Sequence, residues 1–167
     1  QMLGSQRMKS ALEKFNLNKK TEISLPGETY SNLKTDDAWK TFYQATVGFG
    51  QGISVTPLQM VMAYVPFANE GYWKRPKILL SEVEIPGIQT PIQRKVLSPA
   101  TVKAVREILV SVTEGEKATG TKARIDGIRV AGKTGTAQKY EPGKGYDSKK
   151  YLSSFIGFLP AEKPEIG

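Results

Sequence analysis

The strongest constraint on the fold is a change of hydrophobic period along the chain. Up to Gly115, apolar residues recur mainly at helical spacing, as Met8, Leu12 and Phe15 do near the start. From residue 128 to 159, two apolar stretches flank a polar segment that contains glycine and proline, which predicts an antiparallel hairpin. Helices followed by a terminal hairpin predict an α+β fold, with antiparallel strands and packed helices, and not an alternating βαβ sheet.

Three helices are expected before the hairpin. The first covers Ser5 to Phe15, the second begins with Thr56 as N-cap and Pro57 at the first position, and the third begins at Ser98-Pro99. Pro66 is expected to kink or weaken the second helix, which stops at residues 69–71. The predicted buried stripes of the second and third helices are Leu58, Val61, Met62 and Val65, and Val102, Val105, Leu109 and Val112. Short strands and turns are expected over residues 76–96, and a loop over residues 120–126.

Composition excludes several kinds of chemistry. The 167 residues include no cysteine and no histidine, which removes disulfides, thiol catalysis, the commonest general base and the commonest metal ligand. Acid–base chemistry within this chain is therefore left to Lys, Asp, Glu or Tyr. The net charge of +8 comes from basic residues that are scattered and not interleaved with aromatic side chains, so no nucleic-acid partner is expected. No stretch approaches the roughly 18–20 apolar residues of a membrane span.

The residues with the clearest chemistry are Lys133-Thr134-Gly135-Thr136, which we call the motif. On a strand, its ammonium group and two hydroxyls lie within about 10 Å of one another and suit a substrate carboxylate. A glycine inside a strand often marks close approach by a ligand, and free strand N–H groups suit an extended peptide or an oxyanion. On these four residues alone, a polar strand end with a turn glycine remains an alternative.

The surrounding sequence resembles the class B penicillin-binding proteins, in particular their division-associated branch. Residues 130–139 resemble the third active-site motif of this family, whose first two are Ser-x-x-Lys and a Ser-x-Asn type triplet. Residues 151–161 resemble the strand that follows it. Upstream, residues 48–59 are similar to the glycine-rich turn that leads into a helix. Further matches from about residue 11 to 164, in the same order, include Leu25-Pro26-Gly27-Glu28, Ala68-Asn69-Glu70-Gly71 and Arg75-Pro76.

The resemblance implies a role for each motif residue. Lys133 and Thr136 would be the catalytic residues of this chain, with Lys133 holding the hydrogen bonds around a serine nucleophile. Thr134 and Thr136 would bind the carboxylate of the peptide substrate or of a β-lactam, and the Thr136 N–H would form half of the oxyanion hole. Gly135 and Gln138 complete the implied substrate-binding set. Strand alternation puts Lys133 and Thr136 on opposite faces, so one ligand reaches both only if the strand twists or presents its edge.

The resemblance also implies an activity and a location. The protein would be a peptidoglycan D,D-transpeptidase, in which a serine attacks the D-Ala-D-Ala peptide, releases the terminal D-Ala and passes the acyl group to an amine. Its partners would be peptidoglycan stem peptides, β-lactams and other cell-wall synthesis or division proteins, without a cofactor. A single-pass anchor outside this chain would hold it in the cytoplasmic membrane, with this domain on the extracytoplasmic, periplasmic side.

Two departures from the family pattern limit this interpretation. Ser31-Asn32-Leu33-Lys34 fits Ser-x-x-Lys as a string, but it lies in a polar stretch and after residues 25–28, whereas the family's nucleophile comes before them. We do not expect Ser31 to be catalytic, and no Ser-x-Asn triplet occurs. Residues 1–167 are therefore expected to be the C-terminal portion of a transpeptidase domain. This portion would lack the first two motif regions and the last strand and helix, and so would be an incomplete fold that does not acylate by itself.

Three alternatives to a transpeptidase stay open. A class D-like β-lactamase or a β-lactam sensor domain shares the Lys-Thr-Gly strand, although the matches over residues 25–76 argue against it. A non-catalytic cell-wall scaffold would keep the fold without the nucleophile. A basic polymer-binding module would use only the positive charge.

Overall fold

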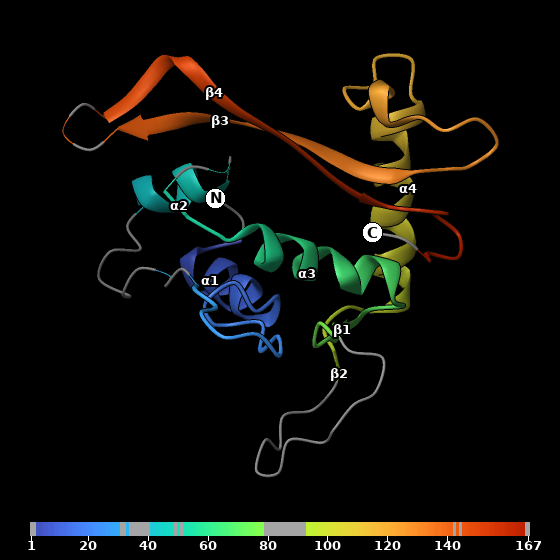
Figure 1. Ribbon diagram of the computed structural model, residues 1–167, viewed down its shortest axis with the longest axis horizontal. Coiled ribbons are helices and arrows are strands. Elements are labelled where there is room, and N and C mark those ends of the chain that lie inside the picture. The colour runs from blue at the N-terminus through green and yellow to red at the C-terminus, as the bar shows by residue number, and fades with distance from the viewer. Residues whose placement is uncertain are drawn as a thin grey trace. The chain divides into compact units, whose positions relative to one another are not determined.

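The computed structural model describes residues 3–30, 33, 41–48, 50, 52–78, 93–141, 143 and 145–165. The chain divides into two compact units, Gln1–Pro99 and Ala100–Gly167. Helices and two antiparallel strand pairs confirm the α+β prediction (Figure 1). The elements in chain order are α1 Ser5–Lys14, α2 Thr41–Gly48, α3 Pro57–Ala68, β1 Tyr72–Lys74, β2 Gln93–Lys95, α4 Pro99–Glu114, the 3-10 turn η2 Thr121–Ala123, β3 Ala131–Glu141 and β4 Gly145–Phe158.

The predicted apolar face of α1 is used for packing. Met8 and Leu12 pack against Val47 of α2, which is 9% exposed. Phe15, just past the end of the helix, stacks on Phe67 of α3 with the ring centroids 5.8 Å apart. The helical spacing of these residues therefore identified both the element and the face that packs, although its side chains are only half-buried.

The segment after α1 forms a loop that is closed by Glu28. Its carboxylate accepts hydrogen bonds from the Thr21 N–H and hydroxyl, both at 2.6 Å, and from the Glu22 N–H at 3.1 Å. Thr21 is completely buried, and Gly27 supplies the positive φ of the turn before Glu28. The Leu25-Pro26-Gly27-Glu28 segment thus has a local structural role.

The predicted start of α3 is confirmed, whereas its predicted buried stripe is partly wrong. Thr56 caps the helix in a capping box, in which its hydroxyl accepts from the Gln59 N–H and its own N–H donates to the Gln59 side chain. The Gln59 amide also donates to the Lys19 carbonyl at 3.0 Å. Because both ends of this amide have partners, Gln59 can be buried at 1% exposure, whereas Val61 is 41% exposed.

The remaining contributions of α3 to the buried interior come from Met62, Ala63 and Pro66. The helix continues through Pro66 to Ala68, so the expected weakening at Pro66 does not end it. Residues 69–71 then stop the helix as predicted, with the Asn69 N–H bonded to the Val65 carbonyl.

The two short strands β1 and β2 pair antiparallel, with Trp73 opposite Arg94. The sequence did not predict β1, because three residues are too short for a period to show. Of the short strands and turns expected over residues 76–96, residues 79–92 lie outside the described residues. Gly71 fixes the base of this β1–β2 hairpin, since its carbonyl accepts from the N–H groups of Val96 and Leu97. At φ +90°, a Cβ at Gly71 would collide with the Leu97 carbonyl oxygen.

In the second unit, α4 lies against the β3–β4 hairpin (Figure 1). Of its predicted stripe, Val102 and Leu109 are buried, at 4% and 7% exposure, whereas Val105 and Val112 are only half-buried. Val110 and Thr113 are buried in addition. The Thr113 hydroxyl donates to the Val110 or Val130 carbonyl, at 2.9 and 2.7 Å, which is how a polar residue fits into this interior.

The predicted terminal hairpin is confirmed, but it is longer than predicted. The whole polar segment between the two apolar stretches was expected to be a connection, whereas β3 runs to Glu141 and β4 begins at Gly145. The expected strand start at Ile128 is also wrong, because Ile128 forms an isolated bridge with Ile125 around Gly127. The loop expected over residues 120–126 contains η2. Polar side chains hid the strand extension, because a two-stranded ribbon exposed to water needs no apolar alternation.

Candidate functional site

The motif lies on β3 in an unbroken ladder with β4. Register runs without a shift from Ala131 opposite Phe158 to Gln138 opposite Tyr151, and the irregularity comes only between Gln138 and Tyr140. Side chains therefore alternate strictly over the motif. Lys133 and Gly135 share one face of the hairpin, and the other face carries Thr134, Thr136 and Gln138.

The edge of β3 that faces away from β4 pairs with no strand in the part of the chain that the structure describes. In an antiparallel ladder, alternate residues direct their N–H and C=O groups toward such an edge. A ligand lying along this edge has the side chains of both faces beside it. The edge therefore gives one ligand access to Lys133 and to Thr136, which the alternation alone would separate.

The polar side chains of the motif differ in their exposure and in their hydrogen-bond partners. The Lys133 side chain is exposed, and its ammonium group donates to the Thr134 carbonyl at 2.8 Å. Thr136 is exposed opposite Ser153, and Gln138 is half-buried opposite Tyr151. The ammonium group and the Thr136 hydroxyl are thus open to an anionic ligand.

Thr134 has a hydroxyl partner that the sequence did not reveal. The Thr134 Oγ1 lies 2.9 Å from the Thr119 Oγ1, in the loop between α4 and η2. Thr119 is followed by Gly120, whose N–H donates to the Val112 carbonyl and so returns the loop to α4. The contact spans 15 residues of sequence. A threonine in a loop carries no periodic signal, and nothing in one sequence pointed to it.

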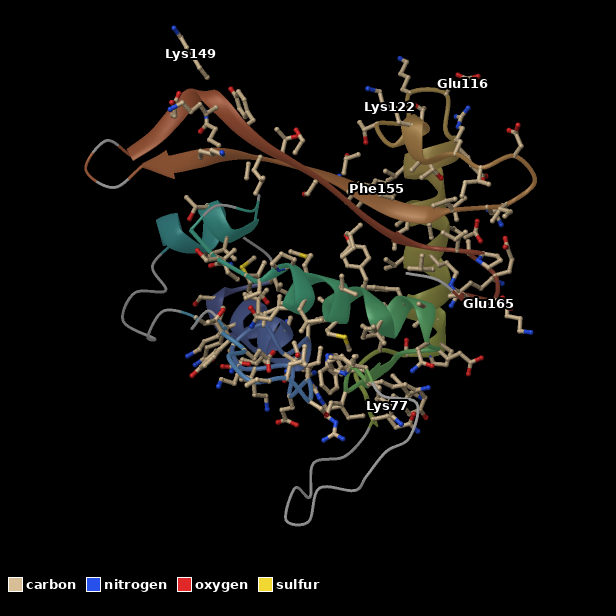
Figure 2. All side chains as sticks on the ribbon, in the orientation of Figure 1. Lys77, Glu116, Lys122, Lys149, Phe155 and Glu165 are labelled. Carbon is tan, nitrogen blue, oxygen red and sulfur yellow. The ribbon has the colours of Figure 1, made fainter. Side chains whose placement is uncertain are left out.

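Glycines let the strands and an aromatic ring approach closely at the start of the motif. Gly132 lies opposite Gly157, and Phe155 of β4 projects over them (Figure 2). A Cβ at Gly132 would overlap the Phe155 ring and would lie 2.9 Å from the Ile156 carbonyl oxygen. A Cβ at Gly135 would lie 2.7 Å from the Ser154 hydroxyl. These positions accept no larger side chain without displacement of a neighbour.

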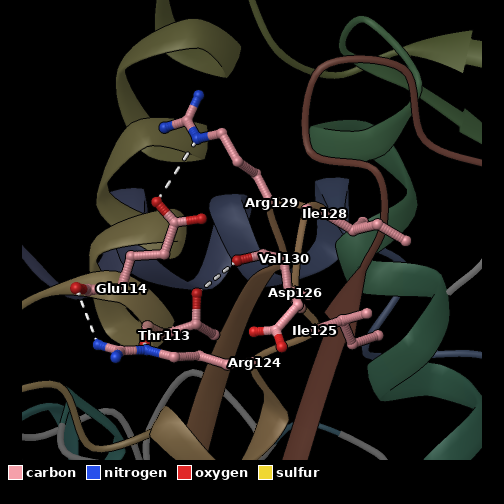
Figure 3. A pocket seen from close by; sticks show the side chains of 9 residues that line it. Thr113, Glu114, Arg124, Ile125, Asp126, Ile128, Arg129 and Val130 are labelled. Carbon is pink, nitrogen blue, oxygen red and sulfur yellow. Dashed lines mark hydrogen bonds and ion pairs between the residues drawn. The ribbon is translucent and has the colours of Figure 1, made fainter.

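Arg124 and Thr113 connect the beginning of β3 to the end of α4 (Figure 3). Arg124 donates to the carbonyls of Thr113, Glu114 and Gly115 at 2.6, 2.9 and 3.3 Å, so it caps the C-terminus of α4. These residues and the turn at Gly127 line an open pocket of about 360 Å³. The pocket lies beside the residues that precede the motif and contains none of the motif side chains.

Arg129, just before β3, is the centre of an exposed ion-pair network. Its guanidinium lies 3.1 Å from Glu107, 3.6 Å from Glu114 and 2.6 Å from Glu162. The hydrogen bonds that Arg129 donates to Glu107 and to Glu162, the first having the larger effect, raise the pKa of Arg129. Two hydrogen bonds lower the pKa of the Glu162 carboxyl: the larger effect comes from its own backbone and the smaller from the Arg129 side chain. The network therefore joins α4 and the segment after β4 to the start of β3.

The described residues contain no group of three or more acidic, histidine or cysteine side chains placed to hold a metal ion. Nor do they contain a helix long and apolar enough to cross a membrane. Ser31 and Lys34, weighed in the sequence as a Ser-x-x-Lys pair, lie outside the described residues.

Solved structures define the class of protein to which this fold belongs. The transpeptidase domain of penicillin-binding protein 3 from Burkholderia pseudomallei matches with a TM-score of 0.83 and 33% identity, over 96% of this chain and 47% of that structure. Penicillin-binding protein 3 from Mycobacterium tuberculosis, complexed with aztreonam, matches with a TM-score of 0.85 and 34% identity, over 95% and 38%. The fold is that of a penicillin-binding transpeptidase domain.

The sequence comparisons agree. The model of the penicillin binding protein transpeptidase domain matches residues 1–167. The chain is 35% identical to penicillin-binding protein PbpB of Mycolicibacterium smegmatis and 38% identical to stage V sporulation protein D of Bacillus subtilis, each over 98% of its length. It belongs to the penicillin-binding protein transpeptidase domain family, as the resemblance predicted. It spans about a quarter of these curated relatives, 27% and 26% of their lengths.

Proposed function

We propose that this chain is the substrate-binding part of a peptidoglycan D,D-transpeptidase. The observation that carries the proposal is the motif on β3, where an exposed ammonium group, two hydroxyls and a strand edge that no described strand pairs with lie together beside a glycine. The family match supports it. So does the 32% identity to a protein of Neisseria meningitidis named a probable peptidoglycan D,D-transpeptidase.

Each group has a task in this proposal. The D-Ala-D-Ala end of a stem peptide lies extended along the free edge of β3, where backbone groups hold it as an added strand. The hydroxyls of Thr134 and Thr136 bind its terminal carboxylate, and Gly135 and Gln138 border the same edge. The ammonium group of Lys133 stabilises charge near the serine, and the Thr136 N–H contributes to the oxyanion hole.

The nucleophile belongs to a part of the protein outside these residues. The serine attacks the carbonyl of the penultimate D-Ala, and the C–N bond to the terminal D-Ala breaks. The acyl group then passes to an amine of a neighbouring stem peptide. β-Lactams acylate the same serine, and structures of Mycobacterium tuberculosis penicillin-binding protein 3 are complexes with aztreonam and with ampicillin.

The setting of the reaction follows from its substrate. Peptidoglycan lies outside the cytoplasmic membrane, so the domain is placed on the extracytoplasmic side by an anchor elsewhere in the protein. Cell-wall synthesis or division proteins are its expected partners there. No cofactor has a part in this chemistry.

The test is labelling of the full-length protein with a fluorescent penicillin, followed by mass mapping of the modified residue. We expect a stable adduct on a serine outside this chain. K133A and T136V should each slow acylation roughly 100-fold, the effect of losing one charge or oxyanion contact. T136S keeps the hydroxyl, and K149A removes an exposed lysine of β4 (Figure 2) that is not opposite any motif residue, so both should label normally.

Two outcomes would contradict the proposal. Normal labelling of both K133A and T136V would remove the motif from the site. Rapid turnover of the adduct to hydrolysed penicillin would instead favour the β-lactamase alternative.

A further inference from the structure

The turn that precedes β3 contains the only Asp-Gly pair of the sequence, Asp126-Gly127. The Ile128 N–H donates to the Ile125 carbonyl at 3.1 Å, so residues 125–128 form a β-turn. Gly127 occupies the third position at φ +77°, and Asp126 before it has no positive φ, which is the pattern of a type II turn. Both residues are exposed, and neither has a part in the proposed transpeptidase site.

The Asp126 carboxyl group is free to react. It forms no hydrogen bond or ion pair with any described residue, although an arginine stands on either side of it in the sequence. Both arginines have other partners, since Arg124 donates to three carbonyls at the end of α4 and Arg129 pairs with three glutamates. The carboxyl group lies at the open pocket beside the start of β3 (Figure 3).

The backbone nitrogen of Gly127 is free as well. The turn is closed by the Ile128 N–H, and the Gly127 N–H has no acceptor among the described residues. A Cβ built at Gly127 would meet no atom within 4 Å, so the space around this residue is open. Asp126 and Gly127 both line the open pocket of about 360 Å³, which gives water access to them. A nucleophilic nitrogen and an unengaged carboxyl group are therefore adjacent in a wet turn.

We infer that Asp126 is a site of spontaneous conversion to isoaspartate. The Gly127 nitrogen attacks the side-chain carboxyl carbon of Asp126 and gives up its proton, and the carboxyl group loses its hydroxyl as water, which closes a succinimide ring. A second water molecule then opens the ring. Cleavage between the nitrogen and the former main-chain carbonyl carbon gives isoaspartate, whereas cleavage on the other side restores aspartate. Because one water is lost and one is gained, the mass and the oxidation state do not change.

The conversion alters the main chain just before the motif strand. In isoaspartate the chain runs through the side chain of Asp126, so one methylene is added between Ile125 and Ile128. Residues on both sides of the turn are anchored: Arg124 caps α4, and the Val130 carbonyl accepts from the buried Thr113 hydroxyl at 2.7 Å. The lengthened turn cannot keep the present bridge between Ile125 and Ile128, and the start of β3 loses support. This inference does not depend on the transpeptidase activity.

Asp147 of β4 is an internal reference in the same unit. Its Oδ1 accepts from the Lys149 N–H at 2.8 Å, and its Oδ2 lies 3.5 Å from the Lys150 ammonium nitrogen. The residue that follows it is not glycine, which is the residue that least hinders ring closure. Asp147 should therefore stay aspartate under conditions that convert Asp126.

The experiment incubates the folded full-length protein in warm, mildly acidic buffer and follows isoaspartate by tryptic peptide mapping. Mild acid favours ring closure, because the carboxyl group loses its hydroxyl readily only when it is protonated. Trypsin cleaves after Arg124 and Arg129, so the peptide of residues 125–129 should appear with time as two species of equal mass that chromatography separates. The new species should accept a methyl group from an isoaspartyl O-methyltransferase, whereas the peptide of residues 145–149 should stay a single species.

Two variants test the chemistry at Asp126. D126E keeps the charge but would have to close a larger, less favourable ring, so its peptide should stay a single species. D126N offers the same nitrogen an amide that loses ammonia, so it should convert faster than the wild type. After conversion the wild-type protein should melt at a lower temperature than the fresh protein, whereas D126E treated in the same way should not change.

Four results would count against this inference. If the isolated peptide of residues 125–129 converted and the folded protein did not, the turn would protect Asp126. Equal conversion at Asp147 would remove the special role of the turn, and a D126N protein that converts no faster than the wild type would show that the Gly127 nitrogen cannot reach the side chain. An unchanged melting temperature after conversion would refute the effect on the start of β3.

Discussion

The close approach of β3 and β4 at Gly132 can be tested by adding a single methyl group. In G132A, the new Cβ would lie 2.8 Å from the Phe155 Cε2 and 2.9 Å from the Ile156 carbonyl oxygen, both inside contact distance. The Phe155 ring is 43% exposed and can swing outward, but the carbonyl belongs to the backbone of β4. The substitution therefore has to separate the strands just before Lys133.

The expected magnitude combines two opposing effects. Overpacking of this kind costs about 1–3 kcal/mol. Because Gly132 is not at a positive φ, alanine also restricts the unfolded chain and returns about 0.4–1 kcal/mol. The net loss of about 1–2 kcal/mol should lower Tm by about 2–4 °C for each kcal/mol in a domain of roughly this size.

The assay is thermal denaturation of the full-length protein, followed by circular dichroism, with fluorescent-penicillin labelling alongside. In an F155A background the ring is absent, so G132A should cost about 1 kcal/mol less there than in the wild type. A G132A protein that melts at or above the wild-type temperature would refute the packing. An equal cost in the two backgrounds would show that the ring takes no part.

Two further predictions concern residues next to the motif. T119V removes the hydroxyl partner of Thr134, so acylation by penicillin should slow roughly five-fold while Tm is kept. T119S keeps the hydroxyl and should restore the rate. Equal rates for T119V and T119S would contradict a hydrogen-bonding role. E162Q should lower Tm slightly at neutral pH. Because the pKa of Glu162 is lowered in the folded state, its stabilising effect is present above the ordinary glutamate pKa and is lost as pH falls through the folded value, so E162Q and wild type should melt together in acid. A difference in melting temperature that persists unchanged at low pH would refute the ion pair as its cause.

Three helices could be located from sequence, α1 from its apolar spacing and α3 and α4 from a cap followed by proline, whereas α2 was not predicted. Their buried faces could not always be predicted either. Thr56, Pro57 and the glutamine three positions after the cap are a capping-box pattern that one sequence reveals. Burial of Gln59 depends on the Lys19 carbonyl, 40 residues away, and no periodicity contains that information. Val61 was placed in the core for its apolar character and is 41% exposed instead.

The candidate site shows the same division between local and distant information. The motif could be read directly, since its residue types and their strand context are contiguous. The Thr119 hydroxyl, the Phe155 ring over Gly132, and the Arg124 cap on α4 each depend on the way in which separate segments meet. Sequence reasoning therefore predicted the groups that touch the ligand in the proposed function, and it missed the neighbours that position those groups.

Lys133 and Thr136 lie on opposite faces of the hairpin because β3 and β4 pair regularly, and this placement favours a ligand that binds along the edge of β3. If the register slipped within the motif, both side chains could share a face, but the ladder is continuous from Ala131 to Gln138. A ligand stacked on either face would then reach the ammonium group or the Thr136 hydroxyl, but not both. A ligand added alongside β3 meets both and gains backbone hydrogen bonds as well. Regular pairing with β4 thus favours binding of an extended peptide, and the glycines at 132 and 135 keep that pairing close without adding a side chain to the edge.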